Sequence, residues 1–229
     1  MNSNNVVIVI VAAMCALSLM AAAGTVLIDE DFNNPQDGAV NGTNLRDNPL
    51  NFPDWNFADT AGLTPEYKTS PTDGVPTSAG DGYVKFDSFS GSGNTYTMQY
   101  DTGHNWSAKE KFTLSINATE QEWNADSSVR TMVVAIKETA RTGNDLTGAT
   151  LWTVSEELIL DPDHDSAGEG WGTNNTFSWE FYAADFTNGT PGTAISFELS
   201  GAGSRGYHFD NVAFTVEIPP PSGTVVVIK

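Results

Sequence analysis

Cysteine and basic residues are both scarce in this sequence. Its one cysteine, Cys15, lies inside an apolar N-terminal run from Val6 to Ala23, so the rest of the chain has neither a disulfide nor a cysteine nucleophile. Lysine and arginine number 10 against 29 aspartates and glutamates, which gives a formal net charge of −19. Because nucleic acids and anionic membranes bind through Lys and Arg, both are excluded as partners. A neutral polymer, a divalent cation or solubility alone is compatible with this charge.

Familiar catalytic signatures are also missing. The sequence has three histidines, none in a His-x-His or His-Glu-x-x-His pattern, and it has no Gly-x-Ser-x-Gly motif. The chain is therefore not expected to be an enzyme. A sandwich-fold glycoside hydrolase or polysaccharide lyase stays open as an alternative, because 29 acidic residues provide many pairs of carboxylates.

The apolar run Val6–Ala23 is followed by polar sequence in which the first charged residue is Asp29. Its end, Ala21–Ala23, has the small side chains of a signal-peptidase site, so residues 1–23 are predicted to be a signal peptide. No Lys or Arg precedes the run, and an uncleaved N-terminal anchor is the alternative. Export without disulfides predicts a secreted or cell-envelope protein of a bacterium.

After Ala23 the sequence shows short alternating apolar and polar runs and no helical period. Clusters of Gly, Asn, Asp, Pro and Thr separate these runs. The alternation predicts strands over Thr25–Phe32, Gly82–Phe86, Asn94–Tyr100, Lys111–Ala118, Val129–Glu138, Thr150–Leu160, Thr176–Ala183, Thr193–Ser200 and Tyr207–Ile218.

The stretch Asn33–Asp81 is rich in proline and is expected to form long loops with one strand around Trp55–Phe57. Many short strands with turns between them are typical of an all-β fold, here an antiparallel β-sandwich or jelly roll. The sandwich is expected to span residues 24–218. Residues 219–229 are a proline break and a short apolar tail.

The last predicted strand carries an acidic residue. Val212, Phe214, Val216 and Ile218 alternate with small or polar residues, the period of a strand with one buried face. Extending this period backwards places Asp210 on the buried face. A buried carboxylate must be paired, hydrogen-bonded or bound to a cation.

Four segments carry a resemblance to a known fold: Glu30–Phe32, Asp101–Ile116, Ala194–Gly201 and Phe209–Val212. In this order they resemble the galactose-binding-like jelly roll of many carbohydrate-binding modules and exported bacterial proteins. The closing segment is also similar to exported proteins that end in a Pro-Glu-Pro sorting signal. That signal is incomplete here, since Ile218 is followed by three prolines.

The resemblance implies a structural calcium ion where the first and last strands meet. Asp210 would lie on one side of the ion, with Glu30 or Asp31 on the other. Calcium prefers roughly six to eight oxygen ligands, so backbone carbonyls would supply the rest. The alternative is that Asp210 accepts backbone N–H bonds and that no metal is present.

A second acidic segment has the spacing that opens a calcium-binding loop. Asp161, Asp163 and Asp165 stand at alternate positions, as they do where side chains converge on a cation. Ser166 and Gly172 then stand where that pattern needs glycine and glutamate. A weaker calcium site and a solvated acidic loop are both compatible with this segment.

Six tryptophans are the main candidates for sugar contacts, because sugars lay their C–H faces on aromatic rings. Trp152 and Trp179 lie in alternating runs and are expected in the core. The other four lie beside loop residues and are candidate exposed platforms for a ligand, with burial as loop anchors the alternative: Trp55, Trp106, Trp123 and Trp171.

These features favour an exported, non-catalytic β-sandwich that binds a polysaccharide, a cell-surface glycan or another extracellular surface component, with a structural calcium ion. A structural or adhesive cell-envelope protein that binds no sugar is the second hypothesis. The glycosidase or lyase is the third. The fold alone does not choose among them, since one fold hosts many functions.

Overall fold

In a computed structural model, the described part of the chain consists almost entirely of β-strands and the turns between them. The residues that the structure describes are 24–33, 43–45, 52–59, 64–69, 82–87, 94–122, 130–143, 145–158, 170–171, 175–203 and 207–219. Within these ranges, no helix is long and apolar enough to cross a membrane.

In the part of the chain that the structure describes, the larger sheet has eight strands, and every pair in it is antiparallel. A path β12-β7-β15-β5-β4-β2 runs through it, with β1 on β15 and β13 on β7. Its strands are β1 (Thr25–Glu30), β2 (Thr43–Asn44), β4 (Thr64–Thr69), β5 (Gly82–Asp87), β7 (Lys111–Glu122), β12 (Gly170–Trp171), β13 (Asn175–Tyr182) and β15 (Tyr207–Glu217).

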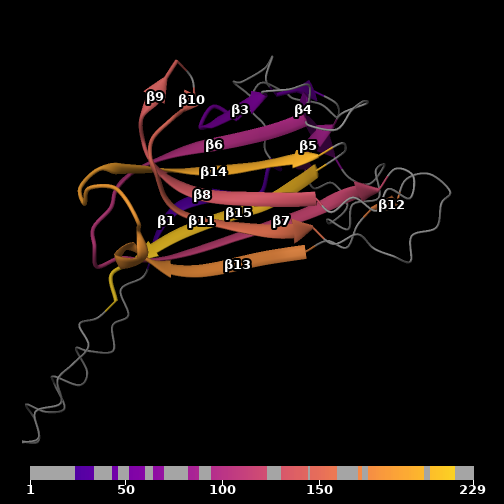
Figure 1. Cartoon of the computed structure of the whole chain (residues 1–229). Helices are drawn as coiled ribbons and strands as arrows, with labels where there is room; N and C mark the ends of the chain where they lie inside the picture. The colour runs from indigo at the N-terminus through magenta and orange to yellow at the C-terminus, as the bar shows by residue number, and fades with distance from the viewer. Residues whose placement is uncertain are drawn as a thin grey trace, which may run out of the picture.

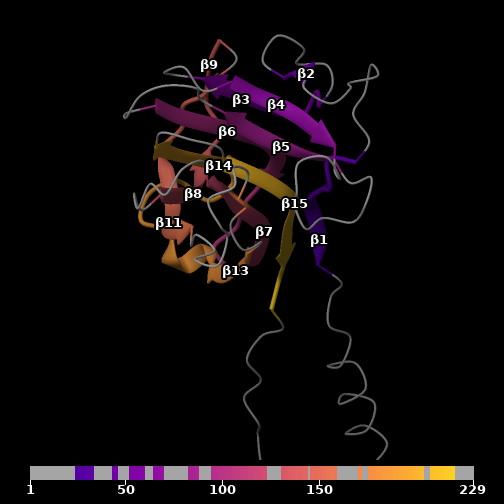
Figure 2. The same cartoon turned by 90° about the vertical axis from the view of Figure 1, so that its right-hand side faces the viewer.

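The smaller sheet has five antiparallel strands in the order β11-β8-β14-β6-β3. These strands are β3 (Trp55–Asp59), β6 (Asn94–Asn105), β8 (Arg130–Glu138), β11 (Thr150–Leu158) and β14 (Ala194–Gly203). Figure 1 shows β6, β14 and β8 running side by side, and Figure 2 shows β1 beside β15 in the other sheet. The predicted antiparallel β-sandwich is confirmed.

All nine strands predicted from alternation are present, each within a few residues of its expected ends, and β3 is the strand expected around Trp55–Phe57. The short strands β2, β4 and β12 were not predicted, and neither were β9 (Arg141–Thr142) and β10 (Asp145–Leu146). β4 has a proline at its second position and Tyr67 as its one aromatic residue, so its alternation is too short to mark a strand in the sequence. Its pairing with β5 fixes it as a strand.

The core between the sheets is aromatic at its centre. Phe112 of β7 is fully buried, and its ring lies 5.4 Å from Phe181, 5.7 Å from Phe186 and 5.6 Å from Phe214. The two sheets meet where the rings of Phe86 and Tyr96 stack at 4.9 Å. Burial of such large rings is the main favourable term in folding, and the stack of Phe86 on Tyr96 joins the two layers.

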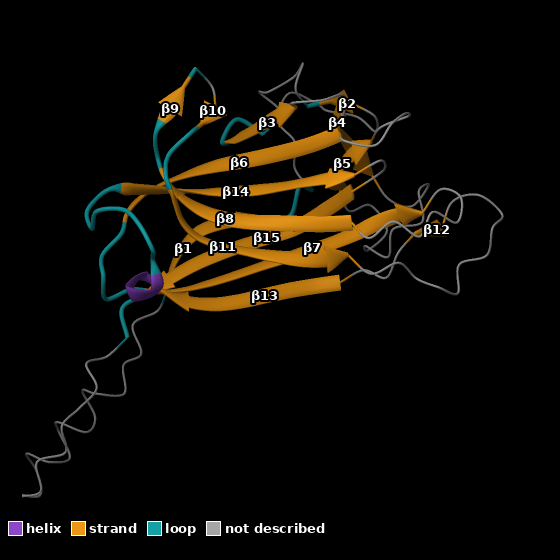
Figure 3. Cartoon of the chain, in the orientation of Figure 1, coloured by secondary structure: helices purple, strands orange, loops and turns teal. Residues whose placement is uncertain are grey.

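A small hairpin projects from the smaller sheet (Figures 1 and 3). It consists of β9 (Arg141–Thr142) and β10 (Asp145–Leu146), which pair with each other. Gly143 in its turn has φ of 65°, a left-handed conformation that favours glycine. A backbone bond of 2.7 Å from the Thr147 amide to the Ala140 carbonyl closes the base of the hairpin.

Candidate functional site

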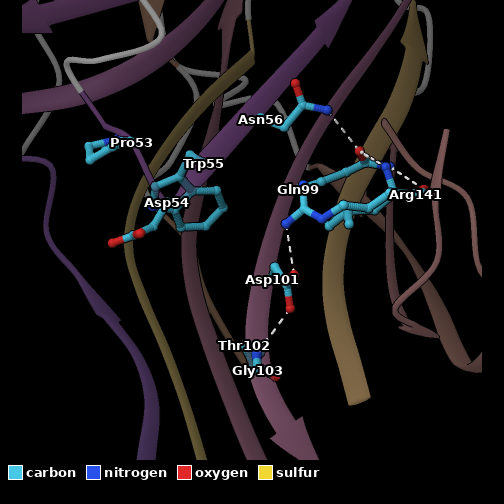
Figure 4. Close-up of a pocket in the computed structure, with 10 residues that line it drawn as sticks. Pro53, Asp54, Trp55, Asn56, Gln99, Asp101, Thr102, Gly103 and Arg141 are labelled. Carbon is cyan, nitrogen blue, oxygen red and sulfur yellow. Dashed lines mark hydrogen bonds and ion pairs between the residues drawn. The ribbon is translucent and has the colours of Figure 1, made fainter. Parts of the chain in front are cut away.

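A hollow of about 610 Å³ lies between the start of β3, the middle of β6 and the β9–β10 hairpin. Figure 4 shows its lining side chains. Its polar side chains are two amides, two carboxylates, one guanidinium and one hydroxyl. These groups belong to Asn56, Gln99, Asp54, Asp101, Arg141 and Thr102.

Strand alternation explains why this lining is polar. β3 pairs with β6 so that Trp55 stands opposite Tyr100, and Asn56 opposite Gln99. Successive side chains of a strand point to opposite faces, so the two rings face the core while the two amides face outward. A turn from Phe52 to Trp55, closed by a 2.9 Å backbone bond, brings Asp54 to the same place.

Gln99 connects the three parts of the site. Its side-chain nitrogen donates to the Leu146 carbonyl at 2.8 Å and to the Glu198 carboxylate at 2.7 Å. Its side-chain oxygen accepts from the Leu146 amide at 2.9 Å and from the Asn56 amide nitrogen at 3.0 Å. Both hydrogens and both lone pairs are used, so this buried amide has one orientation and holds the hairpin against the sheet.

Asp101 and Arg141 form an ion pair at the other side of the hollow. Nη2 of Arg141 donates to Oδ2 of Asp101 at 2.7 Å, while Oδ1 accepts from the Gly103 amide at 3.0 Å. The hydroxyl of Thr139 is 3.5 Å from Oδ1. The carboxylate is therefore held from both oxygens, and it positions the guanidinium over the hollow (Figure 4).

The tryptophans expected as exposed platforms are not exposed where the structure describes them. Trp55 lines the hollow but is 3% exposed, with Nε1 directed to Glu30 at 3.3 Å. Trp106 is 4% exposed and packs on Phe186 with ring centroids 4.9 Å apart. The expectation of open ring faces at these two residues was wrong, because both lie in the aromatic core. Trp123 and the side chain of Trp171 lie outside the described residues.

The tryptophans expected in the core do pack against it. Trp152 and Trp179 are partly buried, and the ring of Trp152 stacks on Phe181 at 4.0 Å with an interplanar angle of 10°. Nε1 of Trp179 donates to Glu156 at 3.0 Å. These contacts join the edge strands β11 and β13, one from each sheet.

The carboxylates of the first strand are occupied by N–H donors. Glu30 accepts from the Phe32 amide at 3.0 Å in addition to Trp55, and Asp31 accepts from the Asn33 amide at 3.0 Å. Burial raises the pKa of the Glu30 carboxyl, and the nearby charges of Asp31 and Asp54 act in the same direction, against the two hydrogen bonds.

Asp210 is buried, at 5% exposure, but not on the face that alternation predicted. A register shift in β15 lies between Asp210 and Ala213, and Asn211 within it has φ of 50°. This β-bulge changes the phase of the strand, so that Phe209 and Val212 both join the core and Asp210 points to the other face. Its two oxygens accept from the backbone amide and the side-chain amide of Asn211 at 2.7 and 2.9 Å.

The proposed calcium ligands do not form a complete set by themselves. Among the described residues, no three His, Cys, Asp or Glu side chains come together as a group able to hold a metal ion. The second candidate set, Asp161, Asp163 and Asp165, lies outside the described residues. Calcium therefore stays a prediction.

Asn56, Gln99 and Arg141 were not predicted as site residues. Gln99 carries a weak signal in the sequence, since it is a long polar residue between Met98 and Tyr100 in a strand. Arg141 carries none, because only the fold of the hairpin brings it to Asp101. The side chains around the hollow can donate and accept hydrogen bonds.

No protein-family model and no curated protein matches the sequence. Among solved structures, the chain is similar to an arabinose-bound α-L-arabinofuranosidase, MgGH51, with a TM-score of 0.52, 13% identity and coverage of 85% of this chain and 27% of that one. At this identity the likeness shows the fold alone, and the chain spans about a quarter of the enzyme.

Two further structures are similar over nearly their whole length. One is the CBM22-1 xylan-binding domain of Xyn10C from Paenibacillus barcinonensis, with a TM-score of 0.45, 12% identity and coverage of 86% of this chain and 97% of that one. The other is the K3 cleaved adhesin domain of Lys-gingipain from Porphyromonas gingivalis, with values of 0.48, 16%, 83% and 99%.

Proposed function

We propose that this chain is an exported, non-catalytic β-sandwich that binds carbohydrate in the hollow between β3, β6 and the β9–β10 hairpin. The observation that carries the proposal is the set of polar side chains fixed around that hollow before any ligand arrives, above all Asn56, Asp101 and Arg141. Sugars are bound by such groups, and a site whose side chains are already ordered loses less entropy on binding.

The apolar run Val6–Ala23 and the lack of cysteine after it support export from a bacterium, either to the medium or to the cell envelope. The charge of −19 supports a partner that is neither nucleic acid nor an anionic membrane. Both oxygens of Asp101 are already engaged, one by Arg141 and the other by Gly103. This supports a role for the carboxylate in binding a ligand rather than as a catalytic acid or nucleophile.

Binding is tested by calorimetry of residues 24–229 against a panel of soluble neutral glycans. Arg141→Ala removes the half-exposed guanidinium from the hollow and is expected to weaken binding by about tenfold, the loss of roughly one charge-assisted hydrogen bond. Lys109→Ala is the control, since it removes the same charge from an exposed position outside the hollow. If no glycan binds at millimolar concentration, the proposal fails. Steady release of reducing sugar in the same mixtures would instead indicate a hydrolase.

We also propose a structural calcium ion at the seam of β1 and β15, supported by the buried carboxylate of Asp210 and by the pairing of Glu30 with Val212 in the neighbouring strand. A ion that binds only the folded state must stabilise it. The unfolding temperature is therefore expected to rise by several degrees in millimolar calcium relative to excess EDTA, and Asp210→Asn is expected to abolish that rise. Equal unfolding temperatures would mean that Asp210 is satisfied by hydrogen-bond donors of the protein, such as the amides of Asn211, and not by calcium.

A further inference from the structure

Arg141 is the feature of the hollow that calls for an explanation in terms of ligand charge. An arginine in a sugar-binding site suggests an acidic sugar, because the guanidinium matches a carboxylate in geometry and charge. Here, however, that partner is already supplied by the protein. Oδ2 of Asp101 is 2.7 Å from Nη2 of Arg141, and the Gly103 amide holds the other oxygen of the same carboxylate.

The surroundings of this pair are negative. Asp54 also lines the hollow, and Asp145 of the hairpin is 3.3 Å from the amide nitrogen of Asn56. The same negative charges act on the phenol of Tyr100 in β6. Burial raises its pKa, and the charges of Asp54, Glu30 and Asp101 raise it further. One arginine thus stands among several carboxylates in a protein of net charge −19.

We propose that the Asp101–Arg141 pair makes the hollow selective for a neutral sugar that presents vicinal hydroxyl groups, and that it excludes uronic acids and other anionic sugars. This inference rests on the proposed carbohydrate-binding function. It identifies Asp101 as the residue that determines the charge of the ligand, and Arg141 as its partner in binding.

The chemistry of a hydroxyl group fits this pair. A sugar hydroxyl is both a donor and an acceptor, so one hydroxyl can accept from the guanidinium while it donates to the adjacent carboxylate. Arg141 makes one described bond to Asp101 and has further N–H groups to donate to a neighbouring hydroxyl. The carboxylate of a uronate has no proton to donate at neutral pH and would be repelled by Asp54 and Asp101.

The test is Asp101→Asn, which removes one charge with almost no change of shape. The carboxamide oxygen can keep the Gly103 bond, while its nitrogen cannot accept from Arg141, which becomes free to bind a carboxylate. Calorimetry is done with a neutral oligosaccharide that binds the unmodified chain and with its uronic-acid counterpart. We expect neutral binding to fall about tenfold and uronate binding to rise about tenfold, each roughly one charge-assisted hydrogen bond.

Glu180→Gln is the matched control. It also converts the carboxylate of an ion pair into an amide. Glu180 pairs with Lys111 at 2.6 Å, and both residues lie in the larger sheet, whereas Asp101 lies in the smaller one. This variant is expected to leave both affinities unchanged, so a general effect of net charge would be visible as a change in the control.

The outcomes separate the two proposals. If neither sugar binds the unmodified chain, the proposed function fails. If neutral sugars bind but Asp101→Asn leaves their preference over uronates unchanged, or the unmodified chain prefers uronates, carbohydrate binding stands and the selectivity assigned to Asp101 is wrong. The unfolding temperature of each variant shows whether it has a folding defect. Adding Arg141→Gln to Asp101→Asn removes the positive charge as well, and this double variant is expected to lose the uronate binding that Asp101→Asn gained.

Discussion

Replacing Phe112 by alanine is expected to lower the free energy of unfolding by about 3–5 kcal/mol, the usual cost of emptying a fully buried aromatic position. Phe112 is fully buried and contacts Phe181, Phe186 and Phe214. These rings come from three other segments of the chain, and no small movement of one of them fills the gap. Unfolding by urea, monitored by tryptophan fluorescence, measures the loss.

Phe177→Ala is the control for that experiment. Phe177 lies on β13, like Phe181, but it is only partly buried and stacks on Trp179 with ring centroids 6.0 Å apart. Its loss is expected to cost about 1–2 kcal/mol, since less apolar surface leaves water when it folds. Equal losses for the two variants would mean that the ring cluster around Phe112 is not the centre of the core.

Replacing Gln99 by alanine is expected to cost about 3 kcal/mol and to remove sugar binding together with stability. The substitution removes the side chain that bonds both the amide and the carbonyl of Leu146, and it leaves the amide nitrogen of Asn56 with its 3.3 Å contact to Asp145. Buried polar groups that lose a hydrogen bond cost roughly 1–3 kcal/mol each when water cannot replace it. The hairpin that carries Arg141 is then no longer held against β6.

Two variants give this prediction its controls. Gln99→Glu keeps the size of the side chain but puts an acceptor against the Leu146 carbonyl and Glu198, so it separates lost hydrogen bonds from lost volume. Asn188→Ala removes an exposed amide that donates to the Thr150 carbonyl at 3.1 Å, and it is expected to cost less than about 0.5 kcal/mol. A similar loss for Asn188→Ala and Gln99→Ala would contradict the role assigned to Gln99.

Alternation along the sequence was sufficient to predict the strands that form the two faces of the core. It succeeds at Phe112, Leu114 and Ile116 because the burial of one side of a strand leaves a period of two in the sequence. It failed for β4, where among the described side chains only Pro65 and Tyr67 stand on the buried side, and for the hairpin, whose two strands are two residues each.

The phase at Asp210 shows a second limit of the same method. Alternation assumes an unbroken strand, and the bulge at Asn211 breaks it by one residue. Asparagine tolerates the left-handed conformation better than most residues, which is a signal in the sequence but not one that fixes the phase. The face of the strand on which Asp210 lies therefore depends on the left-handed backbone conformation of Asn211.

The site depended on tertiary structure more than any strand did. Asn56, Gln99 and Arg141 lie far apart in the sequence, and each is an ordinary polar residue in its own segment. Tryptophans were predicted as sugar contacts because their rings stack on sugars in many proteins. Trp55 and Trp106 are instead buried in the aromatic core. The polar residues next to them carry the candidate chemistry.

The way in which the hairpin is attached has a consequence for how this protein can change over generations. The backbone bond between Thr147 and Ala140 closes its base. The side chain of Gln99 holds β10 by bonds to the backbone amide and carbonyl of Leu146. Backbone atoms are present whatever side chains the hairpin carries. New residues can therefore be tried at its tip, and new ligands acquired, while the sandwich beneath keeps its packing and the chain continues to fold.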